Sequence, residues 1–458
     1  MNAKTIFMSC LICAVVCRAE VVTYSAPAGE PLSETYQVSV NGLPVDVYTA
    51  RVLDPPFDVS GRDYGGNYSF ANFDMNGPVE VSITARQTVS NSIIRPLSRR
   101  VSFQVKDEHT LTFALDKPCK LSIEPSGKND PLLLFANPME AERPDLSGPD
   151  VVYFGPGIHR PDKIVVTNGQ SLYLAGGAVV KGGVIVDGDD VRIAGRGILD
   201  GSDYKWRTGP TPHVLSMTGS RIEVCGITIR GASHWTIAPN KSNDVTIRNV
   251  KICGARVQND DGIDICNSQN VLITDCFLRT DDDCVALKGM GWGQPPWKNI
   301  ENVRVENSVF WCDRARVFLL GHESRADYMQ NITFSNLDII HFNMTPFLLE
   351  PGEEMMLKNV TVENIRIYGE GQEELIRLRP MVNKYMQNKV PGHIQDISFR
   401  NLTVFGEPGQ YMIRVLGSNE THQVENVRFE NVEILNNDLS IGSDALQTGP
   451  YAENIFIE

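Results

Sequence analysis

The feature that most limits how this chain can fold is a short sequence unit that recurs through much of its length. Each unit has six residues, alternates apolar and polar side chains, and ends on Asn or Asp at the same place. Such alternation predicts a β-strand with one buried face. The units occupy residues 244–249, 270–275, 302–307, 331–336, 359–364, 396–401 and 426–431. Repetition at this scale indicates a solenoid in which each repeat stacks on the next.

The spacing of the units indicates which kind of solenoid to expect. Successive units start 26 to 37 residues apart, which is longer than a hairpin and suits a coil of short strands and turns. Stacked coils bury a continuous core, so we expect a right-handed single-stranded parallel β-helix over residues 150–458. The Asn or Asp that ends each unit should then stack as a ladder at one bend, bonded to the neighbouring turns.

The preceding part of the chain, residues 20–145, has a different pattern. Runs such as 36–40, 79–83 and 101–105 alternate with a period of two and are separated by clusters of Gly, Pro and Asp. This pattern predicts a small antiparallel β-sandwich, and the all-β chain would then have two domains. Residues 138–149 have the composition of a linker between them.

Residues 1–19 resemble a secretory signal peptide. Lys4 supplies the charged start and residues 6–16 the apolar run, so we expect a secreted or periplasmic protein. A lipid anchor on Cys17 is an alternative, which the large Val16 before it disfavours. No later run approaches the roughly 18 apolar residues that a membrane span requires, and we expect no span.

The acidic composition limits the partners. A formal net charge of −14 argues against nucleic acid and anionic membranes, although a local cluster of Arg and Lys could still bind an acidic sugar polymer.

Three of the ten cysteines lie in the signal segment, and the other seven fall mostly in apolar strand-like runs with no zinc-type CxxC pair. We expect no metal or other cofactor, and we expect a monomer.

Two acidic segments, 259–262 and 280–284, are the strongest chemical signal. Asp261 and Asp283 are 22 residues apart and begin similar stretches, so stacking would place them on neighbouring strands about 4.8 Å apart. Like charges at that distance disfavour joint ionisation and raise one pKa, which suits the acid and base of glycosidic bond hydrolysis. Asx turns that satisfy their own backbone are the alternative, but turns do not require carboxylates in register.

Polar side chains also follow two later strands. His322 comes directly after the apolar run 318–320, and Arg377 and Arg379 flank Leu378. If Leu378 faces inward, strand alternation turns both cations outward into the open trough of the solenoid. A pair of arginines at a solvated edge is the alternative interpretation.

These residues resemble the signatures of glycoside hydrolase family 28, the polygalacturonases, whose fold is the pectin lyase-like solenoid. The matching segments are Asn259-Asp260-Asp261, Asp282-Asp283, Gly321-His322 and Arg377-Leu378-Arg379, in the order of that family. Residues 283–288 also resemble its DDCIALK stretch. The resemblance covers residues 151–458 and implies hydrolysis of a polysaccharide such as pectin or galacturonan.

The resemblance also implies roles for single residues. Asp282 would be the general acid on the glycosidic oxygen, and Asp261 and Asp283 would activate a water whose direct attack inverts the anomeric centre. His322 would tune the acid. Substrate binding would fall to Asn259, Lys288, Arg377 and Arg379.

Three positions depart from the family pattern. Asp260 stands for the usual Thr and Glu323 for the usual Gly, and both add acidic side chains that should disfavour a carboxylate-bearing sugar nearby. Arg379 stands for Lys, which keeps the charge and changes the binding geometry. The N-terminal sandwich resembles that of glycoside hydrolase family 49, the dextranases and isopullulanases, so a neutral α-glucan is the alternative substrate.

Two further classes of function remain open on this fold, because fold does not fix function. A polysaccharide lyase would need a base and a cation, for which Asp244, Asp260 and Asp264 could hold calcium. A non-catalytic carbohydrate-binding solenoid would not require two adjacent carboxylate clusters. The residues favour the hydrolase.

Overall fold

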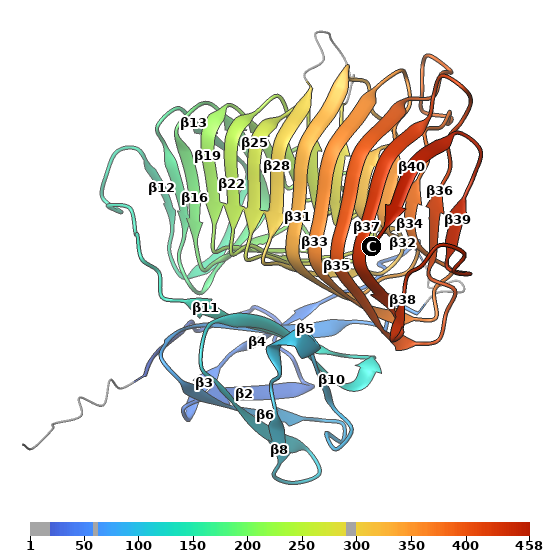
Figure 1. The fold of residues 1–458 in the computed structure, drawn as a ribbon. Coiled ribbons are helices and arrows are strands. Elements are labelled where there is room, and N and C mark those ends of the chain that lie inside the picture. The colour runs from blue at the N-terminus through green and yellow to red at the C-terminus, as the bar shows by residue number, and fades with distance from the viewer. Residues whose placement is uncertain (1–18, 58–62, 290–298) are drawn as a thin grey trace, which may run out of the picture.

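The computed structural model describes residues 19–57, 63–289 and 299–458, which form two all-β regions (Figure 1). Its described residues contain strands and one 3-10 turn, η1 (Leu97–Arg99), and no α-helix. None of the described helical structure is long and apolar enough to cross a membrane. The predicted signal segment lies outside the described residues except for Ala19.

The N-terminal region is a sandwich of two sheets that lies beneath the solenoid in Figure 1. One sheet contains β1 (Glu20–Thr23), β4 (Val47–Ala50), β5 (Tyr68–Asn76), β7 (Ile93–Arg95), β10 (Cys119–Lys128) and β11 (Leu132–Pro138). The other contains β2 (Tyr36–Val40), β3 (Leu43–Val45), β6 (Val79–Ala85), β8 (Phe103–Val105) and β9 (Thr110–Leu115). All pairs are antiparallel except β5 with β11, which run parallel. Apolar residues of both sheets form one buried core between them.

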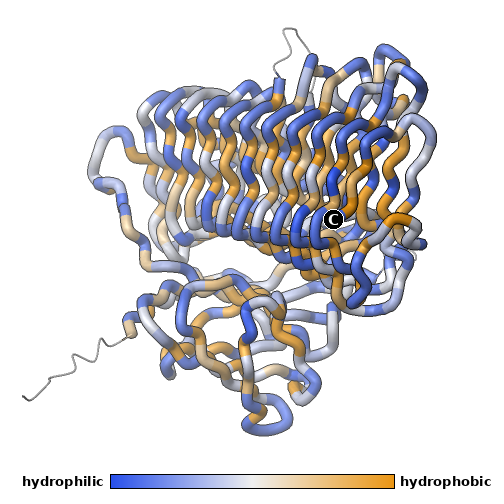
Figure 2. Tube along the Cα trace, viewed as in Figure 1, coloured by the Kyte–Doolittle hydropathy of each residue, from blue (hydrophilic) through white to orange (hydrophobic). Residues whose placement is uncertain are grey.

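The C-terminal region is a right-handed parallel β-helix, as the repeats predict. Among the described residues its sheet has 29 strands, which all stack in parallel in three rows except β38, and the first strand, β12, begins at Val151. Figure 2 shows apolar and polar positions alternating along each coil and lining up from coil to coil. The inward positions form one continuous buried core. The seven described cysteines are buried and unbridged, so the described coils are held together without disulfides.

The first row carries the repeated sequence unit. It contains β12 (Val151–Phe154), β14 (Ser171–Leu174), β16 (Val191–Gly195), β19 (Ser220–Cys225), β22 (Asn243–Arg248), β25 (Gln269–Thr274), β28 (Ile300–Glu306), β31 (Tyr328–His341), β33 (Met356–Glu370), β35 (His393–Glu407), β37 (Val424–Ile434) and β40 (Ala452–Ile457). A short strand, β38 (Asn437–Asp438), pairs antiparallel with β37. The row therefore continues to the last coil.

The predicted ladder is present at the end of each unit. Its members all have positive φ, which Asn and Asp tolerate: Asn249, Asp275, Asn307, Asn336, Asn364, Asn401 and Asn431. Asn336 Nδ2 donates to Asn307 Oδ1 at 2.7 Å, so neighbouring coils are joined through side-chain amides. A second ladder links the unit starts, where Asn302 Nδ2 donates to Asn270 Oδ1 at 2.9 Å and Asn331 Nδ2 donates to Asn302 Oδ1 at 3.1 Å.

The second row packs on the sandwich. It contains β13 (Gly157–Thr167), β15 (Ala178–Asp187), β17 (Ile198–Asp200), β20 (Thr228–Arg230), β23 (Lys251–Cys253), β26 (Phe277–Thr280) and β29 (Val309–Cys312). Phe277 and Trp311 share a buried apolar cluster with Phe135 of the sandwich. Arg196 Nε also forms a buried ion pair with Asp74 Oδ1 at 2.7 Å. The sandwich and the solenoid are thus joined by a buried apolar cluster to which both contribute.

The third row carries the predicted site. It contains β18 (Leu215–Thr218), β21 (Ile237–Pro239), β24 (Ile263–Cys266), β27 (Val285–Lys288), β30 (Arg316–Gly321), β32 (Thr345–Glu350), β34 (Glu374–Leu378), β36 (Met412–Val415) and β39 (Leu446–Thr448). Both acidic segments enter strands of this row, and His322 follows another. The register of this row therefore decides which of these side chains meet.

Candidate active site

The register stacks the predicted catalytic carboxylates. Ile263 pairs with Val285, and Val285 pairs with Phe318, so Asp261 lies beside Asp283 in the neighbouring coil. The carboxylates of Asp261, Asp282 and Asp283 each place one oxygen within 4.8 Å of the others. The structure thus brings together Asp261 and Asp283, which the spacing predicts to be neighbours, and Asp282, which the family resemblance adds.

Asp282 is the most accessible of the three carboxylates, with 11% of its side chain exposed against 4% for Asp261 and 3% for Asp283. Asn259 Nδ2 donates to Asp282 Oδ2 at 3.2 Å, and the guanidinium of Arg314 pairs with the same oxygen. The backbone N–H of Asp283 donates to Asp282 Oδ1 at 3.1 Å. Asp282 therefore faces outward while donors fix its orientation.

Asp261 and Asp283 are recessed, and each faces a buried cation. Lys288 Nζ lies 3.2 Å from Asp261 Oδ2 and 2.8 Å from Asp264 Oδ1. Arg316 Nε lies 3.1 Å from Asp283 Oδ1, and the Arg316 backbone N–H donates to the same oxygen. Because a buried charge is costly without a partner, these cations keep two carboxylates in the interior.

The pKa values of the recessed carboxylates are displaced upward. Burial, followed by repulsion from Asp264, raises the pKa of Asp261 well above its ordinary value. Burial also raises the pKa of Asp283 and raises that of Asp264 to about 7. For Lys288, burial lowers the pKa, but the negative charges of Asp264 and Asp261 outweigh burial and raise the pKa well above its usual range. The cluster therefore holds carboxyl groups whose protonation differs from that of free aspartate.

A loop of the sandwich reaches this cluster. Tyr64 OH donates to Asp281 Oδ1 at 2.6 Å, and Arg314 Nε donates to Asp281 Oδ2 at 2.8 Å. Burial raises the pKa of Asp281 to about 6. Since Arg314 also contacts Asp282, the sandwich contributes to the position of the residue that orients the proposed acid.

Asp260 does not lie where the sequence pattern placed it. It is fully buried, and it accepts the backbone N–H of Asp281 at 2.6 Å and that of Arg256 at 3.0 Å. The expectation that its charge faces the sugar is therefore wrong, because the carboxylate caps the turn on the protein side. Glu323 is the departure that does approach the cluster, with an oxygen 4.0 Å from Lys288 Nζ.

His322 and Arg377 form a second group around a glutamate that sequence reasoning missed. Glu350 is the last residue of β32. Its Oε2 lies 3.2 Å from His322 Nδ1, and its Oε1 lies 3.5 Å from Arg377 Nη1. Arg377 is also held by Glu374, at 2.8 Å and 2.9 Å. Leu378 is buried in the core, so both flanking arginines face outward as strand alternation predicts. The contact of Arg379 is with Met381 Sδ at 4.0 Å.

Several residues near the carboxylates were not predicted. Arg314 comes from the turn of the next coil, and alternation alone does not separate it from surface arginines. Arg316, the first residue of β30, differs from it, because alignment of the coils by their apolar residues places Arg316 level with Asp261 and Asp283. Trp235 covers Lys288, with its ring centroid 3.9 Å from Nζ. Burial lowers the pKa of the neighbouring His234 to about 4. The stacking of coils brings these side chains to the carboxylates, and no local sequence motif marks them.

Known proteins match this chain over different lengths. Residues 177–310 match the family model described as Glycosyl hydrolases family 28. Isopullulanase from Aspergillus niger is 22% identical over 419 residues, which cover 72% of this chain and 69% of that relative. Exopolygalacturonase B from Aspergillus niger is 26% identical over 207 residues, which cover 39% of this chain and 45% of that relative. The chain thus spans less than half the length of the exopolygalacturonase.

The fold has a solved counterpart over nearly the whole chain. Dex49A from Penicillium minioluteum aligns with a TM-score of 0.68 at 16% identity, covering 95% of this chain and 96% of that chain. The Family 28 exopolygalacturonase from Yersinia enterocolitica aligns with a TM-score of 0.51 at 12% identity and similar coverage. The likeness to Dex49A includes the sandwich as well as the solenoid. Residues 177–310 of this chain are therefore similar to family 28 glycosyl hydrolases, and the chain as a whole has the right-handed parallel β-helix fold found in known glycoside hydrolases.

Proposed function

We propose that this chain hydrolyses glycosidic bonds of a polysaccharide by a single displacement that inverts the anomeric centre. The observation that carries the proposal is the unequal access to three carboxylates within 4.8 Å of one another. The most accessible carboxylate, Asp282, would face the sugar, and the other two are recessed behind it. This arrangement supports an acid and a water-holding pair.

Asp282 is the proposed general acid. It is the outermost carboxylate, and its two oxygens are oriented by Asn259 and Arg314 on one and a backbone N–H on the other. A proton on Asp282 would pass to the glycosidic oxygen as the bond to the leaving sugar breaks. Asn259 thus positions the acid, in addition to the substrate-binding role expected from the sequence.

Asp261 and Asp283 are proposed to hold the attacking water and to take its proton as it adds to the anomeric carbon. Among the described residues, Asp261 Oδ1 has no hydrogen-bond partner although it is buried, so a water would satisfy it. The usual separation of carboxyl groups in inverting enzymes is about 6.5–9.5 Å, which is wider than the cluster. The separation alone is closer to the roughly 5–5.5 Å of retaining enzymes. The recessed position of Asp261 and Asp283 supports the proposal instead, because a recessed carboxylate can receive a water more readily than a sugar carbon. This favours attack by water over a covalent sugar intermediate.

The first candidate substrate is a galacturonan. The family 28 match and the exopolygalacturonase relatives favour it, and Arg377 and Arg379 face outward as a carboxylate-binding pair would. His322 lies in the same group, linked through Glu350.

A neutral α-glucan is the second candidate, and a specific observation favours it. Arg377 is already paired with Glu374 and lies beside Glu350, so most of its charge is compensated before any sugar arrives. The isopullulanase relative also covers more of the chain than the exopolygalacturonases do. A compensated arginine binds hydroxyl groups with less dependence on substrate charge.

A polysaccharide panel tests the activity, and product chemistry tests the mechanism. New reducing ends without ultraviolet absorbance indicate hydrolysis. An unsaturated product that absorbs in the ultraviolet would indicate a lyase. If neither is detected, the chain is a carbohydrate-binding protein. Proton NMR of the first product should show the anomer opposite to that of the substrate bond. Retention of configuration would refute the water-holding role of Asp261 and Asp283.

The two arginines separate the two candidate substrates. If the polymer is acidic, Arg377→Ala and Arg379→Ala should raise KM for an acidic oligosaccharide more than for a neutral one. Equal changes for both oligosaccharides would remove the galacturonan proposal and leave the α-glucan.

A further inference from the structure

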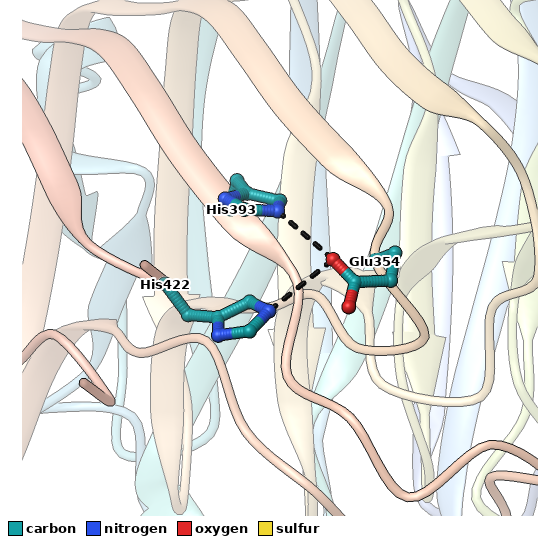
Figure 3. A group of neighbouring side chains, drawn as sticks. All are labelled: Glu354, His393 and His422. Atoms are coloured by element: carbon teal, nitrogen blue, oxygen red, sulfur yellow. Dashed lines mark hydrogen bonds and ion pairs between the residues drawn. The ribbon is translucent and has the colours of Figure 1, made fainter. Parts of the chain in front are cut away.

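Three side chains from three successive coils meet away from the carboxylate cluster, at the turns that lead into the first row. Glu354 comes just before β33, His393 is the first residue of β35, and His422 comes just before β37. Figure 3 shows the two imidazole rings directed at one carboxylate oxygen of Glu354. The coil stacking of the solenoid thus places two imidazoles and a carboxylate together, although they span 68 residues of sequence.

The distances in this group match those between ligands of one small metal ion. His393 Nε2 and His422 Nε2 both lie 3.2 Å from Glu354 Oε2, and the three ligand atoms lie within 4.8 Å of one another. Ligands bound tetrahedrally at about 2.0–2.1 Å are separated from each other by about 3.3 Å. An ion could therefore be bound with little movement of these side chains.

The protonation of His422 gives a second, independent indication. Asn419 Oδ1 accepts the backbone N–H groups of Thr421 and His422, each at 3.0 Å, which fixes this atom as the oxygen of the amide. His422 Nδ1 lies 2.9 Å from the same oxygen and 3.0 Å from Thr421 Oγ1, whose hydroxyl donates to Asn419 Oδ1 at 2.8 Å, so an N–H on Nδ1 satisfies both contacts with the amide oxygen. In the neutral form of the ring, this tautomer leaves Nε2 without a proton beside Glu354 Oε2. Two lone pairs facing each other at 3.2 Å need a cation between them, either a proton or a metal ion.

The supporting contacts resemble those that orient metal ligands. Histidine ligands commonly donate their other ring N–H to a carbonyl or carboxylate oxygen, as His422 does to Asn419. The turn that carries Glu354 is fixed by its backbone N–H, which donates to Pro391 O at 3.1 Å, and by that of His393, which donates to Met355 O at 2.9 Å. The first two coils are therefore already held in register at this point.

We propose that Glu354, His393 and His422 bind one divalent first-row transition-metal ion, such as Zn²⁺, with solvent completing its coordination. Two imidazoles and a carboxylate suit this class of ion, whereas Ca²⁺ prefers oxygen ligands alone. The ion joins three coils near the C-terminal end of the solenoid and takes no part in bond cleavage. It also steadies the turn beside Glu353, which pairs with Arg325 at 3.0 Å.

The test uses the full chain, dialysed against chelator and titrated with Zn²⁺ by calorimetry, with thermal unfolding followed in parallel. We expect about one equivalent of Zn²⁺ to bind at micromolar concentration and to raise the melting temperature, and Ca²⁺ to do neither. Glu354→Gln keeps the shape of an exposed side chain and should weaken Zn²⁺ binding by at least about tenfold. His422→Ala should abolish it.

Two controls keep the outcome decisive. His109→Ala removes an exposed histidine of the sandwich and should leave Zn²⁺ binding unchanged. Asp282→Asn should also bind Zn²⁺ normally, which separates this site from the hydrolytic one. Equal Zn²⁺ affinity in the wild type and in Glu354→Gln would overturn the proposal, as would an absence of binding to the wild type.

Discussion

The carboxylate cluster of the third row and the asparagine ladders of the first row are built by the same operation, yet they behave differently. In both, stacked coils bring equivalent side chains into contact. An amide both donates and accepts, so Asn307 can accept from Asn336 on one side and donate to Thr274 on the other without a counter-ion. An ionised carboxylate only accepts, so Asp261 and Asp283 need Lys288, Arg316 or a proton. The same stacking therefore gives structural support in one row and a reactive site in the other.

One position shows both behaviours. Asp275 is a carboxylate within the ladder of amides, and Lys120 of the sandwich lies 2.6 Å from its Oδ1. The ladder thus accepts a carboxylate where a cation is supplied. This residue offers a matched control, because its conversion to Asn restores the residue type of its neighbours.

The largest effect should come from removing the proton donor of the cluster. We expect Asp282→Asn to lower kcat by about 10³-fold, because an amide cannot act as a general acid, while the melting temperature stays near that of the wild type. Asp275→Asn makes the same chemical change in the ladder and should leave kcat unchanged. Hydrolysis rates and thermal unfolding of both variants check this, and near-normal activity of Asp282→Asn would contradict the assignment.

The next effect concerns the cation that the cluster needs. Lys288→Met should lower the free energy of unfolding by about 3–5 kcal/mol, because it leaves Asp261 and Asp264 buried without their partner. Lys181→Met makes the same substitution where each carboxylate keeps another cation, since Asp200 also pairs with Arg230 and Asp203 with Arg160, and it should cost clearly less. Urea unfolding of both variants measures the difference. Similar losses would show that burial of the carboxylates is not what makes Lys288 necessary.

A smaller effect should appear in the pH dependence of stability. The pKa of Asp264 is raised to about 7 and that of Asp281 to about 6, so the folded chain binds more protons than the unfolded chain between about pH 4 and 7. The contribution of these groups to the free energy of unfolding should therefore fall as pH rises through this window, by at most ~1.4 kcal/mol per pH unit for each group. Asp264→Asn should flatten the slope. An unchanged slope in this variant would show that Asp264 titrates elsewhere.

The smallest effect should come from placing a carboxylate in the amide ladder. Asn336→Asp removes the N–H that donates to Asn307 and sets two acceptors face to face, at an exposed position. We expect a loss of about 0.5–1 kcal/mol in the free energy of unfolding and no change in kcat. Thermal and urea unfolding measure it. A stabilised variant would mean that ladder amides do not act through hydrogen bonds between coils.

The solenoid could be predicted because its period is written into consecutive residues. Alternation in each unit gives the buried face, and the terminal Asn gives the bend, as its positive φ confirms. The stacking of Asp261 beside Asp283 followed from the same period. By contrast, the inward turn of Asp260 depends on which backbone N–H groups lie near it, and no periodic pattern describes a turn.

Contacts between distant segments were also beyond the reach of sequence reasoning. Arg314 reaches Asp282 from the next coil, Glu350 joins His322 to Arg377, and Tyr64 arrives from the sandwich. Each involves a side chain whose local sequence is ordinary. The Glu354, His393 and His422 group has the same origin, since its members have no recognisable spacing.

By itself, the sequence determined the class of this protein: an all-β chain with a repeating coil, a sandwich before it and a row of aspartates in register. These properties are local or periodic, so they can be read from neighbouring residues. Only the tertiary structure decided which carboxylates face outward, which cations compensate them, and that two histidines meet a glutamate near the end of the solenoid. Those properties depend on the register between coils and on the path of each turn, where the free energy of burying a charge selects the partner.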